Sequence, residues 1–128
     1  MEVLADHYYT KDHEWVSFEE DIATIGITDY AQSSLGDITF IELPAVGSEV
    51  DQFEQVASVE SVKAANDVFS PMSGKVIEVN AHLESEPGLI NKNCFETGWI
   101  AKIAVSSAGE KSNLMTADEY RSYLESLE

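Results

Sequence analysis

The 128-residue sequence predicts a mainly β protein with short helices near residues 29–35 and at the C-terminus, about 117–127. The first observation is a series of short β-branched or alternating runs, separated by turn residues. The second is that helix start and stop residues frame only those two segments. The third is the composition, 44% hydrophobic and 24% charged, which is typical of a globular chain. Many short strands of this kind favour a small sandwich or barrel.

The N-terminal third predicts a lead-in strand followed by a hairpin. Leu4, Tyr8 and Tyr9 give residues 1–12 enough apolar surface to pack as a short strand. Residues 13–18 alternate, residues 19–21 form an acidic turn, and residues 22–27 read as the returning strand.

A short helix is predicted over residues 29–35. Thr28 or Asp29 can cap its first turn, and Gly36 is placed to end it. The alternating residues 37–43 then predict a strand, with Ile38 and Phe40 on one face.

Further short strands are predicted at residues 49–51, 55–59, 68–70, 74–80 and 99–105. Residues 84–93 are expected to form a surface loop that Leu89 and Ile90 anchor. Thr116 to Glu119 has the pattern of a capping box, which opens the C-terminal helix.

Lys63 is chemically isolated in the middle of the chain. Between Lys11 and Lys75 there are thirteen Asp or Glu residues and a single basic residue, Lys63. It lies between two strand-like runs, and Asn66–Asp67 supplies turn chemistry between them. We therefore expect Lys63 at or near the tip of a hairpin.

The charge balance limits the partners. The chain has 24 acidic and 7 basic residues, a formal charge of −17, which disfavours nucleic acid and anionic membranes and favours basic protein surfaces. The same charge favours a monomer that docks transiently. There is no apolar run of about 18 residues and no basic, apolar start, so we expect a soluble protein of a bacterial cytoplasm, or of the mitochondrial matrix if it is a mature form.

No catalytic or metal-binding set is predicted. His7, His13 and His82 lack the spacing of a metal-binding pair, and Cys94 is the only cysteine. The sequence has no glycine-rich phosphate loop and no nucleophile motif. A nucleophilic lysine needs burial or neighbouring cations, and neither is predicted around Lys63. Covalent attachment of another group remains the best use for this side chain.

An ordered series of segments resembles the H protein of the glycine cleavage system, a lipoyl carrier family. The matching segments span residues 8 to 103 and continue at the C-terminus: His13–Val16, Gly26–Gln32, Leu35–Asp37, Leu43–Pro44, Val46–Gly47, Val59–Ala64, Ser70–Pro71, Ser73–Gly74, Asn80, Pro87–Asn91, Gly98–Trp99 and Ala117–Tyr120.

The resemblance implies a lipoyl-type flattened β-barrel/sandwich hybrid. Residues 1–128 would form one lipoyl-carrier domain with an N-terminal arm and a C-terminal helical extension. A lipoyl-attaching enzyme would join lipoic acid to Lys63, and Glu60, Ser61, Val62 and Ala64 would surround the attachment point.

The resemblance also implies a role without catalysis. The carrier would take an aminomethyl group from glycine decarboxylase to a tetrahydrofolate-dependent aminomethyltransferase, and dihydrolipoamide dehydrogenase would reoxidise it. The family's carriers are thought to shelter the loaded arm in a surface cleft. Because the cargo amine is cationic, carboxylates near the arm would hold it. Glu14 and Asp67 are the first candidates, followed by Asp12.

Two residues depart from the family's pattern. Phe53 stands where a turn glycine is usual, so we expect a bulge or a different turn type there. Cys94 lies in an altered segment before Gly98–Trp99, and an inert, half-buried thiol is favoured over a reactive one.

Three alternatives to the glycine cleavage carrier stay open. One is a lipoyl relay that donates lipoyl groups to other dehydrogenase complexes. Another is a biotinyl carrier, which Val62 and Ala64 disfavour because that family has methionines beside the lysine. The third is a small acidic enzyme or a non-lipoylated acidic interaction module that uses Lys63 only as surface charge.

Overall fold

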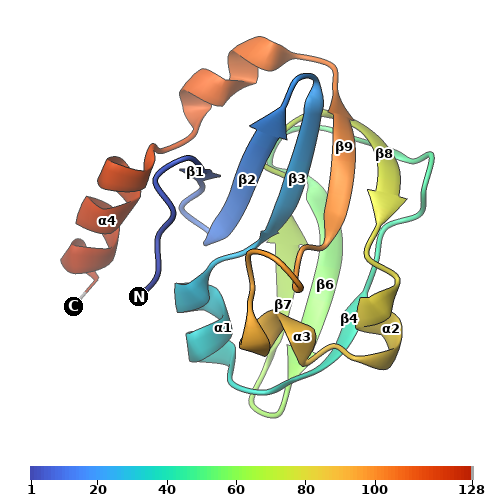
Figure 1. Cartoon of the computed structure of the whole chain (residues 1–128), viewed down its shortest axis with the longest axis vertical. Helices are drawn as coiled ribbons and strands as arrows, with labels where there is room; N and C mark the ends of the chain where they lie inside the picture. Colours follow the sequence, from blue (N-terminus) through green and yellow to red (C-terminus); the bar gives the residue numbers. More distant parts are fainter. Residues whose placement is uncertain (128) are drawn as a thin grey trace.

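The computed structural model describes residues 1–127, whose strands form two antiparallel sheets (Figure 1). The larger sheet has six strands, in the spatial order β1 (Tyr8–Tyr9), β2 (Glu14–Glu19), β3 (Ile22–Ile27), β9 (Ala101–Val105), β8 (Gly74–Val79) and β5 (Glu49–Val50). The smaller sheet has three, in the order β4 (Ile38–Glu42), β6 (Gln55–Ser61) and β7 (Ala65–Phe69).

Short helices connect and flank the sheets. They are α1 (Asp29–Leu35), α2 (His82–Ser85), α3 (Leu89–Lys92), the 3₁₀ helix η1 (Ala108–Asn113) and α4 (Ala117–Ser126). The predicted mainly β fold is confirmed, although the two sheets do not close into a barrel. In residues 1–127 no helix has both the length and the apolar character that a membrane span requires.

The two predicted helices begin and end where their capping residues place them. The Thr28 side chain accepts the Ala31 N–H at the start of α1, and Gly36 ends that helix with φ of 77°. At α4 the Thr116 hydroxyl accepts the Glu119 N–H while the Glu119 carboxylate accepts the Thr116 N–H. This reciprocal capping box satisfies two donors that the helix itself cannot.

The β2–β3 hairpin carries a tryptophan over a glycine. Trp15 pairs with Gly26, and a Cβ added at Gly26 would lie only 2.7 Å from the indole ring. The missing side chain therefore lets the buried ring lie across β3. Its Nε1–H donates to the Cys94 carbonyl, 3.0 Å away, so Trp15 also fixes the segment before β9.

Three sequence expectations need correction. Asn66 and Asp67 do not form the turn but lie in β7, because Ser61 supplies the turn chemistry instead. Phe40 does not share the buried face of Ile38, since a β-bulge between them turns Phe40 outward to 50% exposure. The segment 84–93 is not a plain loop, because it contains part of α2 and all of α3; its anchor is confirmed, with Ile90 fully buried.

The turn before β6 holds Phe53 in a left-handed backbone conformation. Its φ is 67°, a region where a Cβ costs roughly 1–2 kcal/mol. This is the conformation that a glycine would adopt in a turn, so the backbone angle does not bear out the expected bulge or different turn type.

Tyr120 joins the C-terminal helix to the start of the chain. Its ring is fully buried and stacks on Tyr9, with centroids 4.5 Å apart. Its hydroxyl lies 2.8 Å from both Thr28 Oγ1 and His13 Nδ1. The isolated bridge between Tyr9 and Met115 adds two backbone hydrogen bonds between the same segments. α4 is thereby packed against the N-terminal strand, as Figure 1 shows at the left of the molecule.

Replacing Tyr120 by Phe should lower the free energy of unfolding by about 1–2 kcal/mol, because a buried hydroxyl with two partners is lost. Chemical denaturation measures the change. Tyr123→Phe is the control, since its hydroxyl makes one exposed contact of 3.3 Å to the Lys11 carbonyl and should cost less. Equal losses for the two variants would contradict this account.

Candidate functional site

Lys63 lies at the tip of the β6–β7 hairpin, in the turn formed by Val62, Lys63 and Ala64 (Figure 1, bottom). The Ser61 hydroxyl accepts the N–H groups of Lys63 and Ala64, at 3.2 and 3.1 Å. The Ser61 N–H donates to the Ala64 carbonyl at 2.8 Å. Serine thus closes the turn, and the Lys63 side chain is left exposed at its apex.

The segment between α1 and β4 supports this tip from one side. The Val62 N–H donates to the Asp37 carbonyl at 3.1 Å. Gly36 has no side chain, and a Cβ there would stand 3.2 Å from Lys63 Cε. The Asn91 amide, from α3, donates to the Gly36 carbonyl and accepts the Ile38 N–H, both at 2.9 Å. The backbone around the tip is therefore fixed while the lysine stem stays accessible.

The Lys63 amine has no ion pair or hydrogen bond to any of the described residues 1–127. Its flanking residues Glu60, Val62 and Ala64 are exposed, and Ser61 is half-buried. An exposed primary amine on a rigid turn suits amide formation with a carboxylic acid. The predicted attachment point is therefore placed where a modifying enzyme can reach it.

Glu14 is a buried carboxylate at the start of β2, and only 1% of it is exposed. Its Oε2 accepts the Phe69 N–H from the end of β7 at 3.1 Å. Its Oε1 accepts the Thr10 hydroxyl, whose oxygen in turn accepts the Glu14 N–H at 3.1 Å. Burial raises the pKa of Glu14 to about 7, although the bonds from Thr10 and Phe69 oppose that rise.

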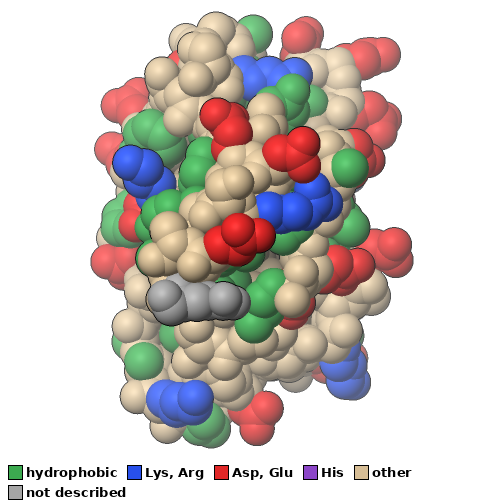
Figure 2. All heavy atoms as spheres, turned by 90° about the vertical axis from the view of Figure 1, so that its left-hand side faces the viewer, with side chains coloured by type: hydrophobic (Ala, Val, Ile, Leu, Met, Phe, Trp, Pro, Cys, Tyr) green, Lys and Arg blue, Asp and Glu red, His purple; other side chains and the backbone are tan. Residues whose placement is uncertain are grey.

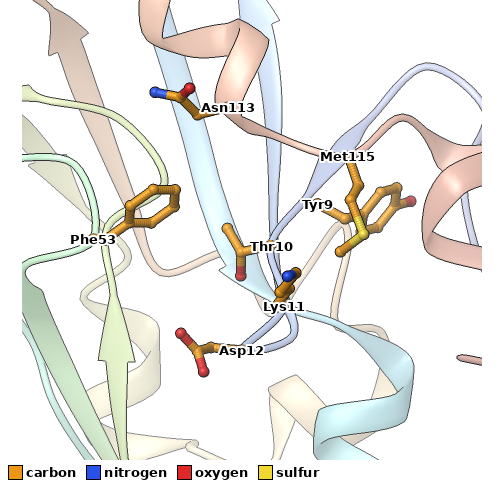
Figure 3. Close-up of a pocket in the computed structure, with 7 residues that line it drawn as sticks. All are labelled: Tyr9, Thr10, Lys11, Asp12, Phe53, Asn113 and Met115. Carbon is orange, nitrogen blue, oxygen red and sulfur yellow. The ribbon is translucent and has the colours of Figure 1, made fainter. Parts of the chain in front are cut away.

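A cleft of about 330 Å³, shown in Figure 3, has Thr10, a hydrogen-bond partner of Glu14, in its lining. Thr10 forms part of the cleft wall and donates its hydroxyl to Glu14, which itself does not line the cleft. The complete lining is Tyr9, Thr10, Lys11, Asp12, Phe53, Asn113 and Met115. The cleft thus pairs an apolar wall with the exposed Asp12 carboxylate and, behind Thr10, the buried carboxylate of Glu14.

Strand β7 connects the hairpin tip with this cleft. Its five residues extend over roughly 17 Å at the usual rise of a strand. Phe69, its last residue, bonds to Glu14, and the next residue, Ser70, accepts the Phe53 N–H at 2.6 Å. Lys63 and the cleft are therefore at opposite ends of one strand.

Of the three predicted cargo carboxylates, the structure brings two together. Glu14 and Asp12 lie at the cleft, Glu14 through Thr10. Asp67 is exposed on β7, opposite Ser58, and accepts a hydrogen bond from Gln55 Nε2 at 3.1 Å. Asp67 is not among the residues that line the cleft.

Several cleft residues were not singled out from the sequence as part of a site. Thr10, Asn113 and Met115 are ordinary residue types far apart in the chain, and no spacing rule connects them. Phe53 was noted only as a departure in a turn, yet its ring is part of the cleft wall.

Cys94 and His13 are shielded from solvent to different degrees, the thiol buried and the imidazole half-buried. Cys94 is buried, and burial raises the pKa of its thiol to about 12, so the favoured inert thiol agrees with its surroundings. Burial lowers the pKa of His13. Among residues 1–127, no three His, Cys, Asp or Glu side chains are arranged to hold a metal ion.

Comparisons with known proteins agree with one another. The family model described as glycine cleavage H-protein matches residues 7–127. The glycine cleavage system H protein of Thermotoga maritima is 51% identical over 90% of this chain and 93% of its own length. A mitochondrial H protein of Arabidopsis thaliana is 50% identical over 96% of this chain and 79% of its own length.

A solved structure gives the same result for the fold. The crystal structure of a glycine cleavage system H protein from Mycobacterium marinum superposes with a TM-score of 0.89 at 33% identity. The superposition covers 96% of this chain and 99% of the Mycobacterium marinum chain. The chain belongs to the glycine cleavage H-protein family.

Proposed function

We propose that the chain is the lipoyl carrier of a glycine cleavage system, with lipoic acid joined to Lys63 by an amide bond. It carries an aminomethyl group from glycine decarboxylase to a tetrahydrofolate-dependent aminomethyltransferase, and dihydrolipoamide dehydrogenase reoxidises it. The observation that carries the proposal is the free, exposed amine of Lys63 on a buttressed hairpin tip, in a member of this family.

The role of the protein is to tether and present, not to catalyse. When bound, the lipoyl group would supply a disulfide that can accept and release the one-carbon unit. Lys63 supplies the attachment point and a flexible stem, and the hydrogen bonds of Ser61 and Val62 fix the backbone of the turn that exposes it. Attachment at one fixed point raises the effective concentration of cargo at a docked enzyme.

The cleft beside Glu14 is the proposed shelter for the cargo amine. A cation that enters it meets Asp12 at the rim and Glu14 behind Thr10. The raised pKa of Glu14 makes this carboxyl readily protonated when the cleft is empty, and a bound cation would favour its ionised form. Asp67 stays a proposed contact along β7, between the tip and the cleft.

The surface charge supports transient docking to basic protein partners. Acidic side chains outnumber basic ones on the face shown in Figure 2, in keeping with the formal charge of −17. Such a field speeds association with positively charged partners and keeps copies of the chain apart. We propose a monomer, one carrier domain over residues 1–128, and a bacterial cytoplasm or mitochondrial matrix as its location.

Chain purified from a lipoate-replete host should carry one lipoyl increment by intact mass, located on Lys63. Lys63→Arg should lack it because a guanidinium cannot form this amide. Lys75→Arg, an exposed lysine on β8, is the control and should keep the increment. A biotinyl mass increment, or no mass increment on the wild type, would contradict the proposal.

Lipoylated chain mixed with glycine decarboxylase should support exchange of carbon dioxide into glycine, and Lys63→Arg should not. Addition of the aminomethyltransferase and tetrahydrofolate should then release ammonia. A lipoylated chain that supports no exchange but donates its lipoyl group to another dehydrogenase complex would identify the relay.

Glu14→Gln should change how stability depends on pH. The pKa of Glu14 rises from 4.5 to about 7 on folding, so the folded chain holds the extra proton between these values. Raising the pH through this window therefore lowers the stability of the wild type, by at most about 3 kcal/mol. Glutamine has no proton to lose.

Denaturation at pH 4 and pH 8 measures the effect. The free energy of unfolding of Glu14→Gln, relative to wild type, should increase between the two pH values. Thr10→Val removes a hydrogen bond that lowers the Glu14 pKa, so in this variant the loss of stability should extend to higher pH than in the wild type. A difference that stays constant with pH would refute the buried, shifted carboxyl.

A further inference from the structure

Phe53 occupies a backbone conformation that does not suit its side chain. Its φ of 67° is in the left-handed region, where glycine is at ease and a bulky residue is an outlier. Its ring is 47% exposed, so burial of the ring does not explain the conformation.

The surrounding hydrogen bonds fix the turn without using the ring. The Phe53 N–H donates to the Ser70 carbonyl, and the Ser70 N–H donates to the Glu54 carbonyl at 2.8 Å. Gln52 Nε2 donates to the carbonyls of Pro71 and Glu110, both at 3.0 Å. These contacts impose the backbone at Phe53, and a glycine would satisfy all of them.

The same contacts place the ring on the cleft. Gln52 Oε1 accepts the Asn113 side-chain amide at 2.9 Å, which joins the turn to another part of the lining. Figure 3 shows the Phe53 ring directed into the cleft toward Thr10, from the side opposite Met115 and Tyr9. Thr10 is the cleft residue that donates its hydroxyl to Glu14.

We propose that Phe53 is a positioning residue of the carrier: its ring, held by the strained turn, walls the cleft and keeps water from Glu14 and from a sheltered cargo amine. This inference rests on the proposed carrier function and deepens it. A half-exposed ring at a strained backbone position is consistent with a local role, since strain of this kind persists only where the surroundings impose it.

The protection concerns hydrolysis of the cargo. One water would attack the methylene carbon and the carbon–sulfur bond would break, with the sulfur taking up a proton; the carbon–nitrogen bond would then break, so the products would be the free thiol, formaldehyde and ammonium. An apolar wall slows this loss because it excludes water from the site and strengthens the attraction between the cargo amine and its carboxylates.

Two variants of Phe53 separate the effect of its ring from the effect of its backbone strain, and a third variant is the control. Phe53→Gly removes both, whereas Phe53→Ala removes the ring and keeps a Cβ at positive φ. Phe40→Ala is the matched control, because Phe40 is 50% exposed on β4 and does not line this cleft. The denaturation midpoint should be higher for Phe53→Gly than for Phe53→Ala, because glycine adopts a positive φ without strain. The reverse order would contradict the claim that the backbone at Phe53 is strained.

The first readout uses the unmodified protein. Carboxyl NMR should show the pKa of Glu14 shifted toward its ordinary value in both Phe53 variants, because the cleft floor becomes wetter, and unchanged in Phe40→Ala. None of the three variants changes Asp12, the other carboxylate at the cleft. A Glu14 pKa that is the same in wild type and both Phe53 variants would overturn the shielding.

The second readout is the rate at which loaded protein loses its aminomethyl group after removal of the enzymes. Both Phe53 variants should lose it several-fold faster than wild type and Phe40→Ala, and equal rates would overturn the proposal. If wild-type chain cannot be lipoylated or loaded, the carrier function fails instead, while the NMR titration still decides whether the ring covers Glu14.

Discussion

The buried carboxylate of Glu14 joins the two sheets of this molecule. One oxygen accepts the N–H of Phe69 at the end of the smaller sheet, and the other accepts the hydroxyl of Thr10 from the N-terminal segment. A buried charged group is costly unless it is hydrogen-bonded, so both donors have to stay in place. Glu14 therefore fixes where the base of the Lys63 hairpin sits relative to β2.

Trp15, the next residue, makes the complementary contacts. Successive side chains of a strand point to opposite sides, so Trp15 packs across Gly26 and reaches the Cys94 carbonyl while Glu14 faces β7. Two adjacent residues thus determine the position of the hairpin on one side and of the segment before β9 on the other. The Lys63 tip and the cleft are both arranged around this pair.

Local signals predicted much of the fold. The caps at Thr28 and Thr116 located two helices, because these side chains satisfy donors of their own first turn. Asn66–Asp67 led to the wrong turn residues because Ser61, five positions before Asn66, closes the hairpin. The outward position of Phe40 depends on a bulge that alternation cannot show.

The site could be predicted only in part for the same reason. Lys63 stood out through its isolation in an acidic stretch, which is a property of the sequence itself. The cleft is built from residues 9–12, 53, 113 and 115, which only tertiary structure brings together. No periodicity links Thr10 with Met115. The position of the Phe53 ring in the cleft wall could likewise be seen only from its backbone angle and its neighbours in the structure.

The cleft's composition also sets an order of completion during synthesis. The β6–β7 hairpin ends at Phe69, whereas Asn113 and Met115 of the cleft lining leave the ribosome later. Met115 bridges to Tyr9, so this part of the cleft wall forms only after Met115 has been synthesised, although β1 can pair with β2 before then. A nascent chain can thus expose Lys63, the proposed attachment point, before the cleft proposed to shelter its cargo has formed.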